Sequence, residues 1–424
     1  MKHPALLMLL ILAVACNQKP RFKTDSKDYE SYLSAVSNST TSKYFKLWNN
    51  KIKTDSLQAL ALGNVAGEYN RFFTGTGNIA FLKKAEKALA KAVEVTAIGK
   101  AGYYRALARI YISQHRFKEA LTFAELALKK GSGVKASHNL LFDVHMELGN
   151  YNTASKYLDS IRNMSDFGYL IRLAKWNDYK GNLDTTIRLM EKATTKAESS
   201  KNRQLLLWCY TNLADYYGHA ERIQESYKHY LKALKIDSKN AYAKKGIAWI
   251  VFSHEKDGPE ALRILNAITK THKLPDYHLL RAEIAEFMND DALKKTALDA
   301  YYKSVSDKAY GDMYNAYTIN LYLEELQGLD NALELAKREV ENRPTPESFG
   351  MLAYSYLKKG EPEMALELAQ NHIAGKTQEP AILQHLAEIY KTNGKTKEVR
   401  ELKKELLNAL YELGPNASKK VGML

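Results

Sequence analysis

The stretch that decides the fold runs from Leu207 to Asn240 and reads LWCYTNLADYYGHAERIQESYKHYLKALKIDSKN. Apolar or small residues recur three and four positions apart in both of its halves, which is the period of a helix with one buried face. A short polar segment separates the halves. The stretch therefore predicts two amphipathic helices joined by a tight turn.

The same pattern recurs along the chain. Its core, Leu-Ala-x-x-Tyr, begins at Leu107, Leu213, Leu352 and Leu386, and degenerate copies fill the gaps between them. Several copies are 34 residues apart, including the last two, and glycine-containing turns separate the helical segments. Glycine accepts the left-handed backbone that ends many helices. A fixed period of this length is typical of stacked helical hairpins.

Two helices, a tight turn and a period of 34 resemble the tetratricopeptide repeat. In residues 207–240, Leu213, Ala214, Tyr217, Tyr230 and Ala233 stand where that family has its packing residues. The resemblance implies an all-α, right-handed superhelical solenoid of about ten tetratricopeptide-like hairpins over residues 56–413, with a C-terminal tail at 414–424. The copies near 274–345 are the weakest, and we expect them to be shifted by a residue or more.

The composition sets limits on the partners. The 424 residues carry a formal net charge of +14, but the lysines are scattered along the chain in short runs. Scattered charge is typical of solvated helix faces rather than of a nucleic-acid track. We therefore expect no nucleic-acid partner. The 28 tyrosines fit the packing positions of the repeats, and we expect most of them in the core.

The amino terminus predicts export. Lys2 and His3 precede a short apolar run that ends in small residues before Cys16, as in a secretory signal peptide. The segment Ala13-Val14-Ala15-Cys16 also resembles the bacterial lipoprotein box, which implies a signal peptide at 1–15, lipidation of Cys16, and a lipidated tether with a first helix at 16–55. The alternative is an ordinary signal peptide cut near Ala15, with an incidental cysteine.

Together these features resemble the tetratricopeptide repeat lipoproteins of Gram-negative bacteria, particularly the Bacteroidota type. That resemblance implies a lipid anchor in the outer membrane. Asn17 follows the cysteine where an aspartate favours retention at the inner membrane, and no acidic cluster of the surface-export kind follows. We expect the periplasmic face rather than the cell surface.

No motif predicts an enzyme, a metal site or a cofactor. Gly75–Ala80 fits a dinucleotide-binding fingerprint, but a helical pattern precedes it where that motif needs a strand. His138 and His145 lie seven positions apart, whereas helical zinc ligands are usually four apart. The cysteine other than Cys16 is Cys209, which lies inside a helical apolar pattern and is predicted to be a buried thiol. An enzyme within residues 274–345 is the weakest of the three functions considered.

Binding in a hairpin solenoid takes place along the concave face. The residue after the alanine of each Leu-Ala-x-x-Tyr copy, and the residue four positions before it, share one stripe of the first helix. The stripe and the start of the best repeat give the predicted groove residues: Arg105, Arg109, Asp143, Lys175, Trp208, Asp215, Lys245 and Trp249.

This stripe mixes both signs of charge with aromatic groups. We expect a non-catalytic protein-protein interaction scaffold that holds a protein or peptide partner in the cell envelope. The alternative is a glycan-binding surface lipoprotein of the polysaccharide-utilisation type, which such aromatic groups also suit.

Overall fold

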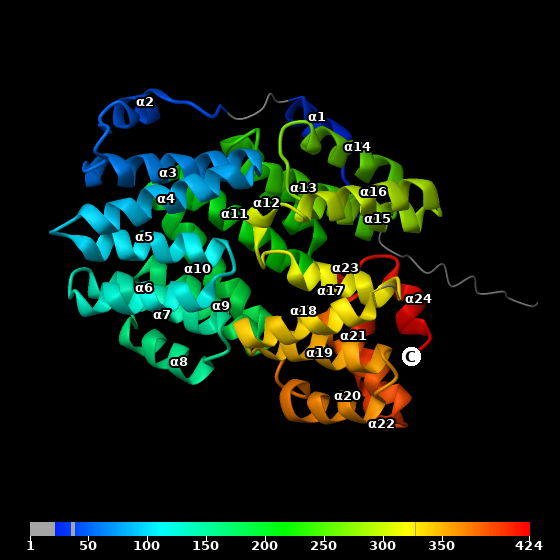
Figure 1. Cartoon of the computed structure of the whole chain (residues 1–424). Helices are drawn as coiled ribbons and strands as arrows, with labels where there is room; N and C mark the ends of the chain where they lie inside the picture. The colour runs from blue at the N-terminus through cyan, green and yellow to red at the C-terminus, as the bar shows by residue number, and fades with distance from the viewer. Residues whose placement is uncertain (1–21, 35–38, 327) are drawn as a thin grey trace, which may run out of the picture.

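The computed structural model describes residues 22–34, 39–326 and 328–424. All regular elements in these ranges are helical, and they comprise α1 to α24 and three short 3-10 or π segments. Successive helices pair as antiparallel hairpins, and the hairpins stack side by side (Figure 1). The predicted all-α hairpin solenoid is confirmed.

The ten hairpins follow the chain in order. The first five are α3 (Ala59–Thr76) with α4 (Ile79–Val95), α5 (Lys100–Ser113) with α6 (Phe117–Lys129), α7 (Val134–Glu147) with α8 (Tyr151–Ser160), α9 (Phe167–Tyr179) with α10 (Leu183–Ser200), and α11 (Arg203–His219) with α12 (Ile223–Ile236). The last five are α13 (Ala241–Trp249) continued by the π segment η1 (Ile250–His254) with α14 (Gly258–Thr269), α15 (Asp276–Phe287) with α16 (Asp291–Val305), α17 (Asn315–Glu324) with α18 (Leu329–Asn342), α19 (Pro346–Lys358) with α20 (Pro362–Leu368) and its π extension η3 (Ala369–Ile373), and α21 (Pro380–Thr392) with α22 (Thr396–Leu407).

Small residues set how closely neighbouring helices approach. Ala214 on α11 is fully buried against the neighbouring helices. At Gly246 on α13, a Cβ atom would lie 2.1 Å from the ring of Tyr230 on α12. A side chain of any size at position 246 would therefore push the two helices apart.

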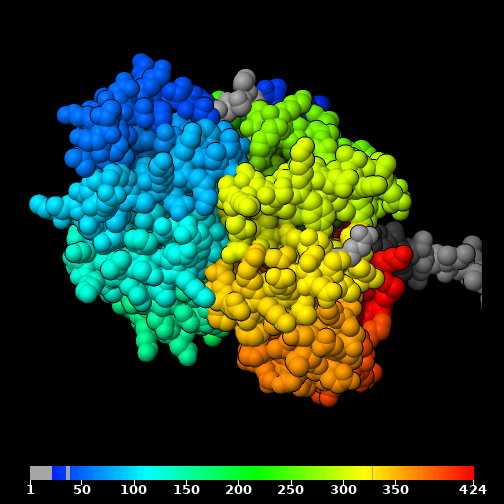
Figure 2. Space-filling view, viewed as in Figure 1, coloured from blue at the N-terminus to red at the C-terminus, as the bar shows by residue number. Residues whose placement is uncertain are grey.

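The solenoid closes on itself between distant hairpins. The backbone N–H of Lys273, after α14, donates a 2.8 Å hydrogen bond to the carbonyl of Thr76 at the end of α3. The ring of His272 lies 3.1 Å from the carbonyl oxygen of Thr74. The first hairpin thus contacts the loop that follows the sixth. In Figure 2 the blue and cyan atoms of the early hairpins lie directly against the yellow atoms of the later ones.

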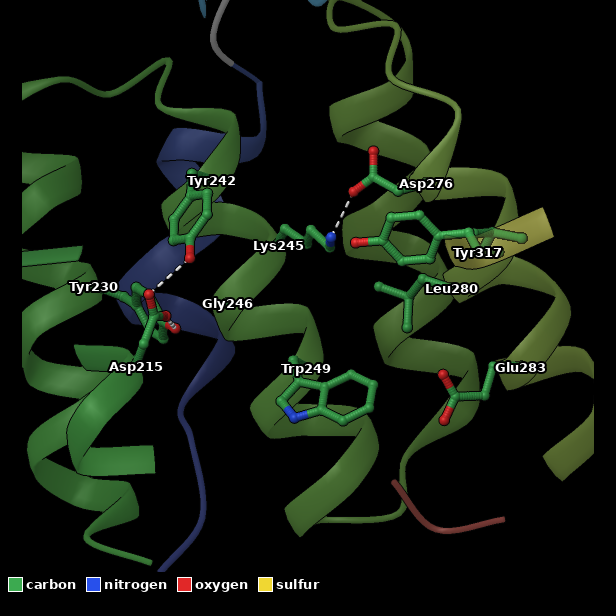
Figure 3. Close-up of a pocket in the computed structure, with 11 residues that line it drawn as sticks. Asp215, Tyr230, Tyr242, Lys245, Gly246, Trp249, Asp276, Leu280, Glu283 and Tyr317 are labelled. Atoms are coloured by element: carbon green, nitrogen blue, oxygen red, sulfur yellow. Dashed lines mark hydrogen bonds and ion pairs between the residues drawn. The ribbon is translucent and has the colours of Figure 1, made fainter. Parts of the chain in front are cut away.

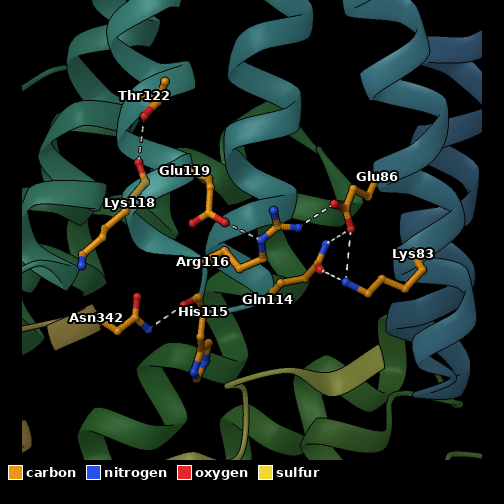
Figure 4. Close-up of polar contacts among 9 residues, drawn as sticks. All are labelled: Lys83, Glu86, Gln114, His115, Arg116, Lys118, Glu119, Thr122 and Asn342. Atoms are coloured by element: carbon orange, nitrogen blue, oxygen red, sulfur yellow. Dashed lines mark hydrogen bonds and ion pairs between the residues drawn. The ribbon is translucent and has the colours of Figure 1, made fainter. Parts of the chain in front are cut away.

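A second closing contact joins the α5–α6 turn to the end of α18. The side chain of Asn342 donates a 3.0 Å hydrogen bond to the carbonyl of His115 (Figure 4). In the same turn, Arg116 pairs with Glu86 of the preceding hairpin at 2.6 Å and with Glu119 at 2.8 Å. The α5–α6 turn is therefore bonded both to the preceding hairpin and to the end of the eighth hairpin.

The irregular region between α16 and α17 has a packing role. It contains the 3-10 segment η2 (Lys308–Tyr310), and its Tyr310 and Tyr314 are buried with Tyr301 in the core cluster of the first hairpins. These tyrosines fill the space between the distant hairpins instead of following the repeat pattern. This placement explains why the sequence pattern weakens here.

The segment expected to be a tether is packed where the structure describes it. Helix α1 (Ser26–Leu33) lies on the second helices of the fifth and sixth hairpins. The buried Tyr29 donates a 2.8 Å hydrogen bond to Glu260, and the backbone N–H of Thr24 donates one of 2.7 Å to Glu255. Helix α2 (Lys43–Asn49) then packs on α3. Cys16 and the predicted signal peptide lie outside the described residues.

The predicted C-terminal tail is also packed. After α22 the chain folds back through α23 (Leu410–Leu413) and α24 (Ala417–Gly422), and α23 contacts α11 and η1. Asn416 donates a 2.9 Å hydrogen bond to the carbonyl of Glu283, and Val421 is fully buried. The last residues are therefore part of the folded body. Among the described residues, no helix combines the length and the apolar character needed to span a membrane.

Candidate functional site

Several neighbouring first helices contact one another, including α5 with α7 and α19 with α21, and we call the face that the first helices turn away from their second helices the inner face. A cavity of about 390 Å³ opens on this face between the fifth and eighth hairpins. Three of the predicted groove residues, Asp215, Lys245 and Trp249, line it (Figure 3). Its remaining lining residues are Tyr230, Tyr242, Gly246, Asp276, Leu279, Leu280, Glu283 and Tyr317.

Four lining residues occupy equivalent positions of four successive repeats. Asp215, Trp249, Glu283 and Tyr317 follow one another at steps of 34, and each comes directly after an alanine. The step of 34 thus continues through residues 274–345, where the copies are expected to be weak and shifted. Ala214, Ala248 and Ala282 are buried, whereas Ala316 is only partly buried, and the leucine and tyrosine positions around the last two have changed.

Glu283 and Tyr317 are functional candidates that the sequence interpretation missed. The available signal was the step of 34 counted from Asp215 and Trp249. It was obscured because Arg281 and Asn315 stand where the other copies have leucine or isoleucine.

Asp215 is held by two tyrosines. Tyr230 donates a hydrogen bond to one carboxylate oxygen, and Tyr242 donates one of 2.6 Å to the other. Burial raises the pKa of Asp215, and the two phenol donors oppose that rise. The carboxylate is therefore fixed in place on the left wall of the cavity in Figure 3.

Lys245 bridges to the next first helix. Its ammonium group donates to Asp276 at 2.6 Å. Burial disfavours the ammonium charge and lowers the pKa of Lys245. The charge and the hydrogen bond of Asp276 have the opposite effect, and the pKa is raised overall. This pair links α13 to α15 above the cavity.

Glu283 differs from the other two carboxylates of the cavity. Within the described part of the chain, its carboxylate has no hydrogen-bond or ion-pair partner. A Cβ atom at Gly414 would come within 2.3 Å of this carboxylate and 3.1 Å of the Trp249 ring, so the C-terminal segment lies against both. Burial, together with Glu324 and Glu286, raises the pKa of Glu283 to about 8.

The mouth of the cavity is aromatic. Tyr242 is 55% exposed and Tyr317 is 48% exposed, although most tyrosines of the chain are buried or half-buried. Figure 3 shows them on opposite sides of Lys245. The indole of Trp249 lies deeper, immediately before η1, where the helix takes the π form. Such π turns are frequent at functional sites.

The other predicted groove residues lie outside this cavity and make contacts between neighbouring first helices. Arg105 donates to the hydroxyl of Ser137 on α7 at 3.2 Å, Asp143 pairs with Arg172, and Lys175 pairs with Glu147 at 2.7 Å. Burial lowers the pKa of Arg109, as do Arg172 and Arg105, while Asp143 opposes the shift. Trp208 is 40% exposed and packs edge-on against Phe167.

A second cavity, of about 540 Å³, lies between the third and fourth hairpins and the ninth and tenth. Its lining includes Lys175, and also Asp178, Glu347, Glu379 and Glu412. Burial, helped by Glu412 and Glu347, raises the pKa of Glu379 to about 7. Both cavities are therefore rich in carboxylates, in a chain whose net charge is positive.

Other chemistry has little support in the described residues. They contain no group of three or more His, Cys, Asp and Glu side chains that could hold a metal ion. His138 instead packs on Tyr157, and the ring of His145 stacks on the same tyrosine. Cys209 is a free buried thiol, as predicted, and burial raises its pKa to about 11.

Comparison with known proteins gives one family match. Residues 209–240 match the tetratricopeptide repeat family, within the stretch that first predicted the fold. No curated protein matches the chain.

Among solved structures, the human IFIT1 dimer with PPP-AAAA has a TM-score of 0.46 and 15% identity, covering 74% of this chain and 71% of that one. The human IFIT1 dimer with m7Gppp-AAAA gives 0.47 and 16%, covering 77% and 73%. Yeast Tom70 gives 0.36 and 14%, covering 83% and 92%. At these identities and TM-scores, the matches give no information about what this chain binds.

The chain is thus an all-α solenoid of stacked helical hairpins, in which residues 209–240 match a tetratricopeptide repeat. Repeat solenoids of this class typically serve as non-catalytic binding scaffolds. In this chain the solenoid is coiled tightly enough for distant hairpins to line shared, open cavities.

Proposed function

We propose that the protein is a non-catalytic scaffold that binds an extended peptide segment of a partner protein along its inner face. The observation that carries this proposal is the cavity lined by Asp215, Trp249, Glu283 and Tyr317. These residues follow one another at steps of 34 in the sequence, so four successive repeats each contribute one polar or aromatic group to the cavity. An extended peptide presents its own groups at regular steps and suits a wall of this kind.

The charge of the lining opposes a nucleic-acid ligand. Both cavities carry more carboxylates than cations, and carboxylates repel phosphate groups. We therefore propose a protein or peptide partner and no nucleic-acid partner.

The proposed setting is the cell envelope, with the chain anchored by lipid at Cys16 in the outer membrane and facing the periplasm. Its support is the segment from Lys2 to Cys16, with Asn17 after it. Multiple acyl chains give a stable anchor at ~0.8 kcal/mol per buried methylene. Labelling cells with a lipid precursor tests the anchor, since Cys16→Ala should abolish the label and release the protein from membranes. Unchanged membrane retention of the variant would contradict it.

Affinity capture from envelope membranes tests the scaffold. The full-length protein is compared with a Trp249→Ala/Tyr317→Ala double variant, and co-purifying proteins are identified. We expect a defined partner to be lost from the variant. A variant that captures the same proteins in the same amounts would contradict a role for this cavity.

A glycan-binding role is the second candidate, because the Trp249 ring and the Asp215 carboxylate are groups that sugars also contact. Titration of the full-length protein with soluble oligosaccharides separates the two functions. Saturable binding that requires Trp249 would favour the glycan over the peptide.

A further inference from the structure

The cavity on the inner face holds more carboxyl groups than cationic groups. It contains the carboxyl groups of Asp215, Asp276 and Glu283 but a single cationic side chain, Lys245. The chain as a whole has more cationic than acidic side chains, with a formal net charge of +14. The balance of ionisable groups in the cavity therefore differs from that of the whole chain.

Two of the three carboxylates already have partners. Asp215 accepts hydrogen bonds from Tyr230 and Tyr242, and Asp276 is paired with Lys245. Glu283 has no such partner within the described residues. Ionising an unpaired carboxyl group in a half-buried, partly apolar site is costly, and a cation placed beside it would offset much of that cost.

The protein itself does not supply that cation. The charged groups that face Glu283 are Glu286 on its own helix, Glu324 on α17, Lys245 on α13 and Lys420 on α24. Lys245 is committed to Asp276, and Lys420 is paired with Glu324 at 3.0 Å. The two carboxylates in this set raise the pKa of Glu283, and the two lysines reduce that rise without cancelling it.

The walls around Glu283 suit a cation with an apolar stem. Trp249 and Tyr317 offer aromatic faces, which attract ammonium groups. Leu279 and Leu280 supply apolar surface between them. The volume of about 390 Å³ lies within the range of sites that bind small molecules or side chains.

We propose that this cavity binds an alkylammonium group, namely the side chain of a lysine in the peptide segment, with its ammonium at the carboxylate of Glu283 and its stem against Trp249 and Leu280. The inference rests on the proposed peptide-binding function and names the side chain that the site recognises.

The test uses two blocked amino acids that differ at the end of the side chain. N-acetyl-lysine N-methylamide carries the ammonium, and N-acetyl-norleucine N-methylamide has a similar stem without it. Both are titrated into the full-length protein in detergent by isothermal calorimetry. We expect the lysine compound to bind about tenfold or more tightly than the norleucine compound.

Matched variants locate the charge. Glu283→Gln keeps the shape and removes the carboxylate, so it should weaken binding of the lysine compound about tenfold while leaving the norleucine compound unchanged. Glu286→Gln makes the same chemical change one turn further along α15, outside the cavity lining. It should leave binding of the lysine compound nearly unchanged, because Glu286 does not line the cavity and Glu283 remains. Thermal unfolding of both variants confirms that they are folded.

Proton release gives an independent measurement. With a pKa of about 8, most of the Glu283 carboxyl holds its proton at pH 7 in the free protein. A bound ammonium lowers that pKa, so binding should release up to about 0.9 proton at pH 7 and only about 0.1 at pH 9. Calorimetry in two buffers of different ionisation enthalpy measures this number. Glu283→Gln should release none.

The outcomes separate this inference from the proposed function. Equal binding of the lysine and norleucine compounds, or unchanged lysine binding by Glu283→Gln, would overturn the cation site. Failure of the lysine compound to bind while the partner is still captured through Trp249 and Tyr317 would overturn the cation site alone. Binding of the lysine compound with no partner captured would support the cation site and contradict the scaffold.

Discussion

Ser253 and Tyr411 are 158 positions apart, and the hydroxyl of Ser253 donates a 2.6 Å hydrogen bond to the carbonyl oxygen of Tyr411. The bond joins the π turn η1 to the returning C-terminal segment. Three residues further along, Gly414 lies against Trp249 and Glu283. The C-terminal segment therefore packs against two residues of the candidate site.

The packing of this C-terminal segment predicts a stability cost for the loss of the Tyr411 side chain. The ring packs against Gly218, where a Cβ atom would approach it to 2.9 Å. Tyr411→Ala should lower the free energy of unfolding by about 2 kcal/mol and weaken ligand binding at the cavity. Urea denaturation measures the first effect. Tyr411→Phe keeps the ring and should lose much less, whereas equal losses in the two variants would show that ring packing is not the cause.

The contact between Gly246 and Tyr230 predicts a position-specific effect of alanine. A methyl group at position 246 would overlap the Tyr230 ring, which also holds Asp215. Gly246→Ala should therefore reduce the free energy of unfolding by about 1–3 kcal/mol.

Gly102 provides the matched control. It lies on α5 with open space around its Cβ position. Gly102→Ala should raise the free energy of unfolding by about 0.5–1 kcal/mol, because alanine favours helix. Thermal unfolding of the two variants measures both changes. Equal effects would mean that the helices at position 246 are less tightly packed than described.

The raised pKa of Glu283 predicts a pH-dependent stability. Its folded-state pKa of about 8 exceeds the value of an exposed glutamate, so the folded protein holds more protons between those two pH values. Stability should therefore fall as the pH rises through this window, and the loss should be complete above pH 8. Glu283→Gln should remove this contribution, so the difference in unfolding free energy between variant and parent should grow from pH 5 to pH 9. A constant difference would contradict the assignment.

The closing contacts predict cooperative unfolding. Open solenoids can unfold one repeat at a time because each repeat contacts only its neighbours. Here the first hairpin also contacts the loop after the sixth, and the second contacts the end of α18. Helix content and tryptophan fluorescence should therefore follow the same single transition in urea. Separate transitions would show that the two halves of the coil are energetically independent.

The local part of the fold could be predicted from the sequence because it is periodic. The small residue at each helix crossing, such as Ala214 or Ala248, fixes the hairpin geometry and repeats every 34 residues. The closure of the coil could not be predicted in this way. Contacts such as Tyr29 with Glu260 join single, non-repeated side chains 231 positions apart, and no period reveals them.

The candidate site was predicted in part for the same reason. Asp215 and Trp249 follow recognisable Leu-Ala or Ile-Ala pairs, so the stripe rule found them. Glu283 and Tyr317 follow Arg-Ala and Asn-Ala pairs, and the rule relied on the apolar residue. Asn315 remains buried in its polar form because it is hydrogen-bonded to Asp312 and Glu339. A buried position can thus change chemistry while the alanine beside it keeps the register.

The returning C-terminal segment also sets an order of events during synthesis. Ribosomes make a chain from its amino end, so all ten hairpins are translated before Gly414, which packs against Trp249 and Glu283. The ten hairpins therefore exist for a time without the segment that contacts these two cavity residues. The candidate cavity reaches its final surroundings only after residue 414 has been made.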